Sequence, residues 1–231
     1  MLVKLEYFLT AKSTYNLLKV YMVLFFLSMS TLLYSQKKVI KKFTTSTKAI
    51  YIIAEGLDEL VLENADSECI EIFLYAENPN KQHIIVNEKN SETEIKFKIP
   101  IFKSEAAVFR KYITKRLKRA RAIVKIPKNM GLTVFGESIN ITSKSYHGDL
   151  RIFIENGMVR LDTIQQNLEL KMYAGNLYGV LKKTNLKIVS KIGKIKIDAV
   201  SYQKKYQEKE TSTSKEVSIT TVKGNIFLTH Q

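Results

Sequence analysis

Three aspartates in the C-terminal half of the chain could do acid–base chemistry: Asp149, Asp162 and Asp198. A pair of carboxylates flanking a sugar linkage can hydrolyse it, and the separation of the two groups decides the mechanism. Asp162 and Asp198 are separated by four units of the nine-residue repeat described below. If two units form one coil, these carboxylates lie about 10 Å apart, because neighbouring strands are about 4.8 Å apart. That separation is too wide for a retaining glycosidase and at the limit for an inverting one, so we interpret all three as turn and solvent-face residues.

Motifs for nucleophiles, nucleotides and metals are missing from the sequence. Ser145 and His147 lie close together beside Gly148, but no G-x-S-x-G element surrounds them, and no glycine-rich nucleotide-binding motif occurs. Cys69, the single cysteine, lies in the strand-like run CIEIFL and is expected to be a small buried apolar residue. The three histidines are far apart in sequence with no second cysteine, which excludes zinc fingers and CxxC redox sites. We expect no catalytic residue, no metal site and no cofactor.

Cations are concentrated in a basic excursion, residues 103–122. Seven of them fall within twelve residues and are the candidate binding residues for an anionic surface: Arg110, Lys111, Lys115, Arg116, Lys118, Arg119 and Arg121. Apolar residues recur there at spacings of four, four and three, which is compatible with a short amphipathic helix that binds phosphates or lies on a membrane. We favour a solvated excursion between two strands, because charge runs usually face water. The sequence leaves helix and loop open.

Composition points to an anionic partner. The 231 residues include 37 Lys and Arg against 22 Asp and Glu, a formal net charge of +15. Such a charge favours an acidic polysaccharide, lipopolysaccharide or a membrane surface. Nucleic acid is not expected, because few aromatic residues alternate with the cations. A hydrophobic fraction of 45% without Pro or Gly bias indicates a globular protein and excludes collagen, coiled coil and wholesale disorder; the oligomeric state is left open.

Residues 1–35 are predicted to be a signal peptide. The apolar run at positions 20–33 is too short to span a membrane, because a membrane-spanning helix needs about 20 residues. Ser35 is a small residue at a cleavage site, and no cysteine follows to accept a lipid. The alternatives are an uncleaved anchor or a buried helix, and translation could start at Met1 or Met22. Cleavage leaves a mature chain of net charge +13, expected in the periplasm, on the outer membrane surface or outside the cell.

Residues 36–102 are predicted to be an N-terminal portion made of β-strands. Short runs of β-branched and aromatic residues alternate with turn residues, at 49–54, 59–62, 69–75, 83–86 and 94–101. The last run alternates apolar side chains with lysines, which is the period of a half-buried strand.

Residues 123–231 show a nine-residue period. Aliphatic residues recur at every ninth position: Leu132, Ile141, Leu150, Val159, Leu168, Leu177, Leu186 and Ile195. The residue two positions later is mostly aliphatic, and glycine or asparagine precedes most units. Each unit is therefore a turn followed by a strand of about five residues. The polar segment 202–215 interrupts the pattern and is predicted to be an inserted loop, after which the spacing resumes.

Two all-β architectures fit this unit. One is an antiparallel meander, and the other is a parallel β-solenoid, or β-helix, in which two units form one coil. Leucine occupies the same position in every second unit, four times in succession, so that Leu186 would lie beside Leu168 and Asn185 beside Asn167. Stacking of like side chains favours the parallel β-solenoid.

The repeat also resembles that of a known family. Turns followed by alternating aliphatic residues, at 148–152, 175–180, 193–197 and 224–226, and the link AIVKIPKN at 122–129 resemble the bacterial putative-adhesin proteins with β-strand repeats, relatives of the head-domain GIN family. The likeness covers roughly residues 120–231 and, more loosely, 45–100. It implies a noncatalytic, exported β-helical protein of a Gram-negative cell envelope. The high Lys and Arg content and the basic excursion depart from the family pattern.

Three functions are compatible with the sequence. We favour an exported, noncatalytic cell-envelope protein, an adhesin or a binding module for anionic polymers or surfaces. The first alternative is a carbohydrate-active β-helix enzyme, a lyase or hydrolase that acts on an acidic polysaccharide. The second is a membrane-associated regulator that uses the segment 110–121.

Overall fold

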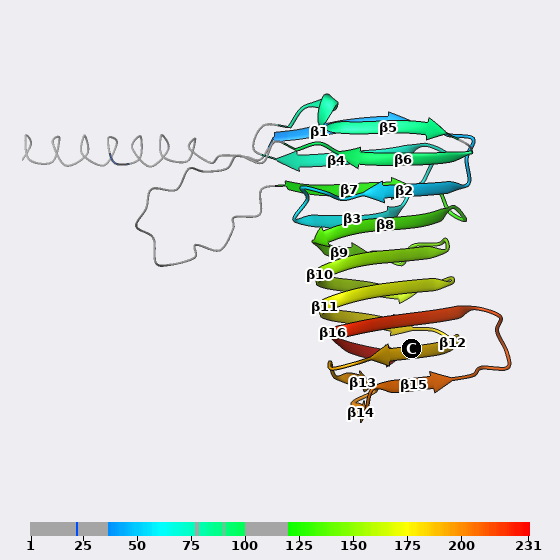
Figure 1. Ribbon diagram of the computed structural model, residues 1–231. Coiled ribbons are helices and arrows are strands. Elements are labelled where there is room, and N and C mark those ends of the chain that lie inside the picture. The colour runs from blue at the N-terminus through cyan, green and yellow to red at the C-terminus, as the bar shows by residue number, and fades with distance from the viewer. Residues whose placement is uncertain (1–21, 23–36, 77–78, 90, 100–119) are drawn as a thin grey trace, which may run out of the picture. The chain divides into compact units, whose positions relative to one another are not determined.

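The computed structural model describes residue 22 and residues 37–76, 79–89, 91–99 and 120–231 (Figure 1). The predicted signal peptide, apart from Met22, and residues 103–119 of the basic excursion lie outside the described residues. Lys37–Gln231 form one compact unit, in which the described residues build a single sixteen-stranded sheet and one 3-10 helix, Lys81–His83. Among the described residues no helix is long and apolar enough to cross a membrane. The prediction of an all-β protein is confirmed.

The strands follow from the alternation of apolar and polar side chains, which turns one set inward. In β4, for example, Ile70, Ile72 and Leu74 are fully buried while the residues between them are partly exposed. The strands are β1 (Lys37–Phe43), β2 (Ala49–Ile53), β3 (Glu59–Asn64), β4 (Ile70–Ala76), β5 (Ile84–Lys89), β6 (Glu92–Phe97), β7 (Ala120–Ile126), β8 (Gly131–Ser138), β9 (Asn140–Ser143), β10 (Leu150–Ile164), β11 (Leu168–Leu181), β12 (Asn185–Ser190), β13 (Ile195–Ile197), β14 (Val200–Tyr202), β15 (Lys205–Glu208) and β16 (Glu216–His230).

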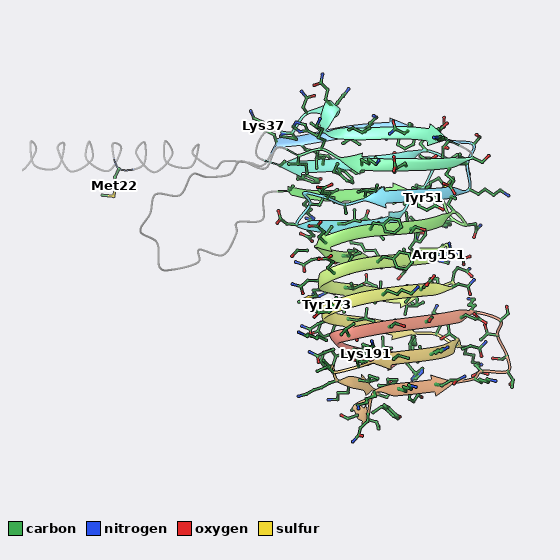
Figure 2. The ribbon with its side chains drawn as sticks, viewed as in Figure 1. Met22, Lys37, Tyr51, Arg151, Tyr173 and Lys191 are labelled. Atoms are coloured by element: carbon green, nitrogen blue, oxygen red, sulfur yellow. The ribbon has the colours of Figure 1, made fainter. Side chains whose placement is uncertain are left out.

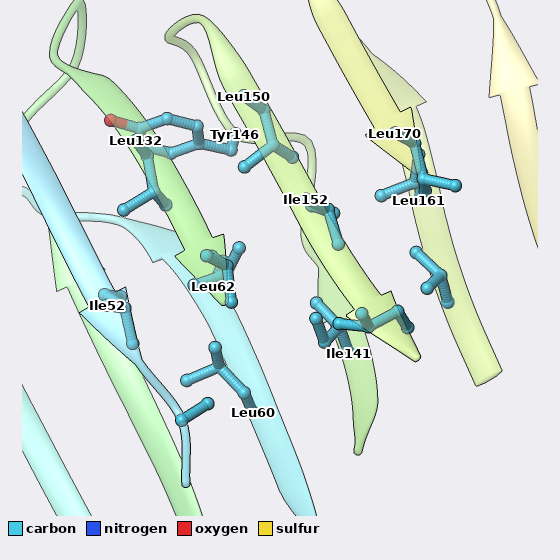
Figure 3. Close-up of a cluster of buried hydrophobic side chains, with 14 of the residues drawn as sticks. Ile52, Leu60, Leu62, Leu132, Ile141, Tyr146, Leu150, Ile152, Leu161 and Leu170 are labelled. Atoms are coloured by element: carbon cyan, nitrogen blue, oxygen red, sulfur yellow. The ribbon is translucent and has the colours of Figure 1, made fainter. Parts of the chain in front are cut away.

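The sheet folds into two faces that enclose one core. On the first face the order is β5, β6, β2, β8, β10, β11, β16, β12 and β15. On the second face it is β1, β4, β7, β3, β9, β10, β11, β16, β13 and β14. The long strands β10, β11 and β16 run through both faces. Figure 3 shows buried side chains of both faces meeting in the core, such as Ile52 and Leu132 from the first face and Leu60 and Ile141 from the second.

The register of the middle strands confirms the predicted stacking of every second repeat unit. Leu150 lies opposite Leu132 of β8 on one side and Leu168 of β11 on the other. All three leucines are buried. Because β8, β10 and β11 pair in parallel, the antiparallel meander is ruled out for this part of the chain.

The prediction that Leu186 lies beside Leu168 is wrong. Val217 of β16 pairs with Leu168 on one side and with Leu186 on the other, so the C-terminal strand is inserted between β11 and β12. The predicted contact of Asn185 with Asn167 is lost for the same reason. Val217 and the buried Ile219 continue the same inward pattern, which is why β16 fits this place as well as β12 would.

The order of the strands in the sheet also differs from their order in the chain at the N-terminal end of the stack. Strand β7 lies between β3, with which it pairs in parallel, and β4, with which it pairs antiparallel. Within the segment 202–215, predicted to be a loop, Lys205–Glu208 form β15, which pairs antiparallel with β12. The parallel stack therefore ends in antiparallel strands at both ends (Figure 1).

Glycines mark the place where the long strands pass from one face to the other. Gly157 of β10 and Gly175 of β11 have φ angles of +149° and +123°, and they pair with each other in the sheet. A Cβ atom on Gly175 would lie 1.9 Å from the carbonyl oxygen of Gly157. Only glycine allows both the backbone angle and this close approach of two strands.

Candidate functional site

The predicted basic cluster is represented in the described residues by Arg121 alone. Arg121 is exposed on β7, and its Nε lies 3.6 Å from Oε2 of Glu59 on β3. The other six cations, from Arg110 to Arg119, lie outside the described residues. On the same face Glu63 is shared by Lys144, at 2.7 Å, and Lys125, at 3.8 Å. The described cations of this part of the second face are thus balanced by glutamates.

The structure does not bring the three candidate aspartates together as one site. Asp149 accepts a hydrogen bond from Asn167 Nδ2 at 3.0 Å, Asp162 is exposed on β10, and Asp198 contacts the His230 ring. Hydrogen bonds from the His230 side chain and backbone lower the pKa of Asp198. Among the described residues no group of three potential metal ligands occurs.

The other sequence candidates lie in turns. The backbone N–H of His147 donates to Asn64 Oδ1 at 2.8 Å, and Asn64 Nδ2 donates to the carbonyl of Ser145 at 2.9 Å. His147 and Ser145 thereby hold the turn after β9 against β3. Cys69 precedes β4 and is only partly buried, so the expectation of a buried strand residue was wrong; the bend before β4 leaves it near solvent.

A lysine-rich end is formed by residues 182–209, which contain nine lysines and two acidic residues. These residues build β12 to β15, at the C-terminal end of the stack, where Lys191 is labelled in Figure 2. All nine lysines are exposed, and none of them forms an ion pair with any residue that the structure describes. They are Lys182, Lys183, Lys187, Lys191, Lys194, Lys196, Lys204, Lys205 and Lys209.

The two acidic residues of this end, Asp198 and Glu208, contact residues other than the lysines. Asp198 Oδ2 lies against His230 Nδ1, and Glu208 Oε2 lies 3.5 Å from His230 Nε2. Glu208 also accepts a hydrogen bond of 2.9 Å from the hydroxyl of Tyr206. Burial, followed by this hydrogen bond, raises the pKa of Tyr206 to about 12. Neither carboxylate is therefore paired with a lysine of this end. Among the described residues only Glu210, just after the segment, has its pKa lowered by hydrogen bonds from Ser212 and in part by one of these lysines, Lys183.

An aromatic groove lies on the second face next to the lysine-rich end. Its outward side chains come from four neighbouring strands in the order Arg160, Tyr178, Phe227 and Lys196. The rings of Tyr178 and Phe227 stack with centroids 5.1 Å apart and planes 14° apart. The guanidinium carbon of Arg160 lies 5.9 Å from the Tyr178 ring centre, close enough for a cation–π contact.

The hollow along these side chains has a volume of about 830 Å³. Its lining includes the partly exposed Val180 and the exposed Asp162 and Thr229, with the buried Leu161 and Leu228 beneath them. Tyr178 is 38% exposed, so the groove is open to water along its length. It offers aromatic and aliphatic surface between two cations, beside one carboxylate.

The first face carries a second aromatic pair in a different charge environment. Phe135 and Phe153 stack with centroids 5.4 Å apart, and Lys171 Nζ lies 5.3 Å from the Phe153 ring centre. That lysine is already paired with Glu169 at 2.7 Å. Because the charge of Lys171 is compensated by Glu169, the pair of Phe135 and Phe153 differs from the aromatic groove and is a suitable control for it.

Sequence reasoning missed both features. The stacking of every second repeat unit places Tyr178 beside Arg160, and this pair could have been found by examining the outward positions of the repeat. Phe227 joins them only through the insertion of β16, which also places Lys196 next to Phe227. The lysines of the C-terminal end are dispersed along the whole segment 182–209, so that no short run of sequence marks them.

Comparison with known proteins defines the fold. No family model and no curated protein matches the sequence. The structure of a putative cell adhesion protein from Clostridium sporogenes superposes with a TM-score of 0.61 at 15% identity, covering 85% of this chain and 100% of that chain. A putative adhesin from Parabacteroides merdae matches with a TM-score of 0.40 at 17% identity, covering 67% of this chain and 60% of that one. At such low identity the likeness concerns the fold, and the chain shares the all-β fold of the Clostridium sporogenes protein.

Proposed function

We propose that this protein is an exported, noncatalytic cell-envelope module that binds anionic polymers or surfaces through its lysine-rich end. The observation that carries the proposal is the set of nine exposed lysines without an ion pair among the described residues. Uncompensated charges of one sign attract polyanions and speed their encounter. That the Clostridium sporogenes neighbour is a putative cell adhesion protein supports a binding role over catalysis.

The same proposal includes the architecture and the location. The parallel pairing of every second repeat unit supports a parallel β-solenoid, in which an elongated stack displays its end to a partner. The apolar run at residues 20–33 supports export across a bacterial inner membrane. The basic cluster from Arg110 to Arg121 is retained as a second proposed contact for the same partner.

The number of lysines gives the interaction its strength. One exposed charge pair contributes only a few tenths of a kcal/mol, but many lysines engage one polymer at the same time and the contributions accumulate. Such contacts weaken as salt shortens the Debye length, which is about 10 Å at 0.1 M ionic strength. Binding should therefore be measurable at low salt and fall steeply as salt is added.

The test removes lysines that lie away from the aromatic groove. Changing Lys187, Lys191 and Lys205 together to glutamate should weaken the binding of fluorescent polyphosphate and of heparin about tenfold or more at low salt, measured by anisotropy. All three side chains are exposed, so the thermal unfolding of the variant should match that of the unchanged protein.

A matched control carries the same change in net charge elsewhere. Lys37, Lys48 and Lys128 are exposed lysines outside the lysine-rich end, and changing them to glutamate should lower affinity by less than about threefold through the long-range field. Equal losses in both triple variants would mean that net charge alone attracts the polymer. That outcome, or undiminished binding by the first variant, would refute the proposed site.

A further inference from the structure

We propose that the aromatic groove binds sugar rings, so that the anionic polymer recognised by this protein is an acidic polysaccharide. This inference rests on the proposed function, because the groove adjoins the lysine-rich end and shares Lys196 with it. The groove adds apolar and aromatic surface to the cationic surface. A polymer such as polyphosphate, which has no apolar groups, gains no favourable contact with that surface.

The stacked rings leave surface for a sugar. Two rings in full face-to-face contact are about 3.5 Å apart, whereas the centroids of Tyr178 and Phe227 are 5.1 Å apart with nearly parallel planes. The two rings are therefore not in full face-to-face contact, and the Tyr178 side chain keeps an exposed fraction of 38%. Pyranose rings pack the C–H groups of one face against aromatic rings, and the partly exposed Val180, two positions after Tyr178 on β11, extends the same surface.

The spacing of the cations suits a polymer that runs across the strands. Arg160, Tyr178, Phe227 and Lys196 lie on successive strands, so that about 14 Å separates the first from the last at about 4.8 Å for each strand step. A strand step is close to the length of one sugar residue in a chain. Arg160 and Lys196 can then receive acidic groups from sugars on either side of those on the rings.

The other features of the groove favour an acidic carbohydrate over phosphates and lipids as its ligand. The carboxylate of Asp162 lies among the lining residues and can only accept hydrogen bonds. Sugar hydroxyls donate to such a group, whereas ionised phosphates offer no donor and are repelled. An acyl chain would need apolar cover on all sides, and the groove is open to water, as the 38% exposure of Tyr178 shows.

The experiment compares two polyanions on two pairs of variants. Changing Tyr178 and Phe227 to isoleucine keeps apolar bulk and strand propensity but removes the flat rings. This variant should bind polygalacturonate and heparin about tenfold more weakly, the effect expected for losing two aromatic contacts, and should bind polyphosphate unchanged. Changing Phe135 and Phe153 to isoleucine on the first face should leave the affinity for all three polymers unchanged.

A spectroscopic reporter tests the groove directly. The chain contains no tryptophan, so the substitution Tyr178→Trp gives an emission signal from the groove alone. Polygalacturonate or heparin should shift this emission to shorter wavelength, and polyphosphate or vesicles of anionic phospholipid should not. A shift with vesicles but not with the polysaccharides would assign the groove to lipid and overturn the inference.

The two proposals fail separately. If the variant of Lys187, Lys191 and Lys205 loses affinity for polyphosphate and heparin while the isoleucine variant of the groove keeps its affinity for both polysaccharides, the groove inference is wrong and the proposed function stands. If the variant of Lys187, Lys191 and Lys205 binds polyphosphate and heparin with unchanged affinity, the proposed function is wrong, whatever the groove binds. The inference would also be overturned if the variant of Phe135 and Phe153 lost affinity for both polysaccharides to the same extent as the groove variant.

Discussion

The most demanding requirement of this fold lies at Gly175, where β11 passes from one face to the other. Its φ angle of +123° belongs to a region that residues with a side chain rarely adopt. A Cβ atom at this position would lie 1.9 Å from the carbonyl oxygen and 2.9 Å from the carbonyl carbon of Gly157 on the neighbouring strand. The substitution Gly175→Ala therefore forces β10 and β11 apart or changes the backbone at the bend.

The cost has two parts. The backbone angle costs an alanine about 1–3 kcal/mol, and forcing extra volume into a packed site costs about 1–3 kcal/mol. Together they give about 4 kcal/mol, a large part of the roughly 5–15 kcal/mol by which most domains are stable. For a urea dependence of about 2 kcal/mol per molar, the midpoint of unfolding should fall by about 2 M.

Urea denaturation followed by circular dichroism measures this shift, and Gly131→Ala is the matched control. Gly131 begins β8 without a positive φ, and the nearest atom to an added Cβ, the carbonyl oxygen of Lys48, is 3.7 Å away, an ordinary contact. This variant should unfold within about 0.5 kcal/mol of the unchanged protein, because alanine fits there and lowers the entropy of the unfolded chain. Midpoints of the two variants within about 0.5 M of each other would refute the reasoning about the bend.

Three further predictions concern the C-terminal end. Ending the chain at residue 215 removes β16 and leaves β11 and β12 without their shared neighbour, so we expect no cooperative unfolding transition in urea. Thr221→Val should lower the free energy of unfolding by about 1–3 kcal/mol in urea titrations, because the buried hydroxyl of Thr221 lies 3.0 Å from Ser190 Oγ and 2.9 Å from the carbonyl of Gly224. The pKa of Tyr206, raised to about 12, predicts stability that is complete below about pH 10 and lost as the pH rises towards 12; in thermal melts Tyr206→Phe should reduce this alkaline loss.

The nine-residue period was enough to predict the inward-facing residues and most of their stacking. Leu132, Leu150 and Leu168 occupy one buried column because side chains alternate with a period of two and each position returns after two repeat units. The position of Leu186 was not predictable in the same way. A hydrophobic pattern specifies which face of a strand is buried, and it does not specify which strand of like pattern is the neighbour, so Val217 could take the place beside Leu168.

A cationic surface could be predicted from the composition, but the strands that carry its lysines could not. Net charge predicts an anionic partner from composition alone, but in the sequence the densest run of cations lies in the basic excursion. Strand pairing instead gathers lysines from separate strands, as with Lys187 on β12 and Lys205 on β15. The ring of Phe227 reaches Tyr178 only because the C-terminal strand is inserted, an event that leaves no local trace in the sequence.

The two ends of the stack differ in how their lysines are used. Unpaired strand edges invite association with other chains, and lysines on edge strands oppose it, which explains why both β1 and β15 carry them. On β1, however, Lys41 Nζ donates to the carbonyl of Ile84 at 2.9 Å, Lys42 pairs with Glu71, and Lys38 lies 4.5 Å from the Phe73 ring centre. A charged side chain on an edge strand opposes association even when it also contacts another group of the protein, so these lysines of β1 protect their edge. The lysines of the C-terminal end have no ion pair among the described residues and lie next to a groove with aromatic walls. Edge protection accounts for the presence of these lysines but not for their lack of ion pairs, which is why we propose a polyanionic partner for them.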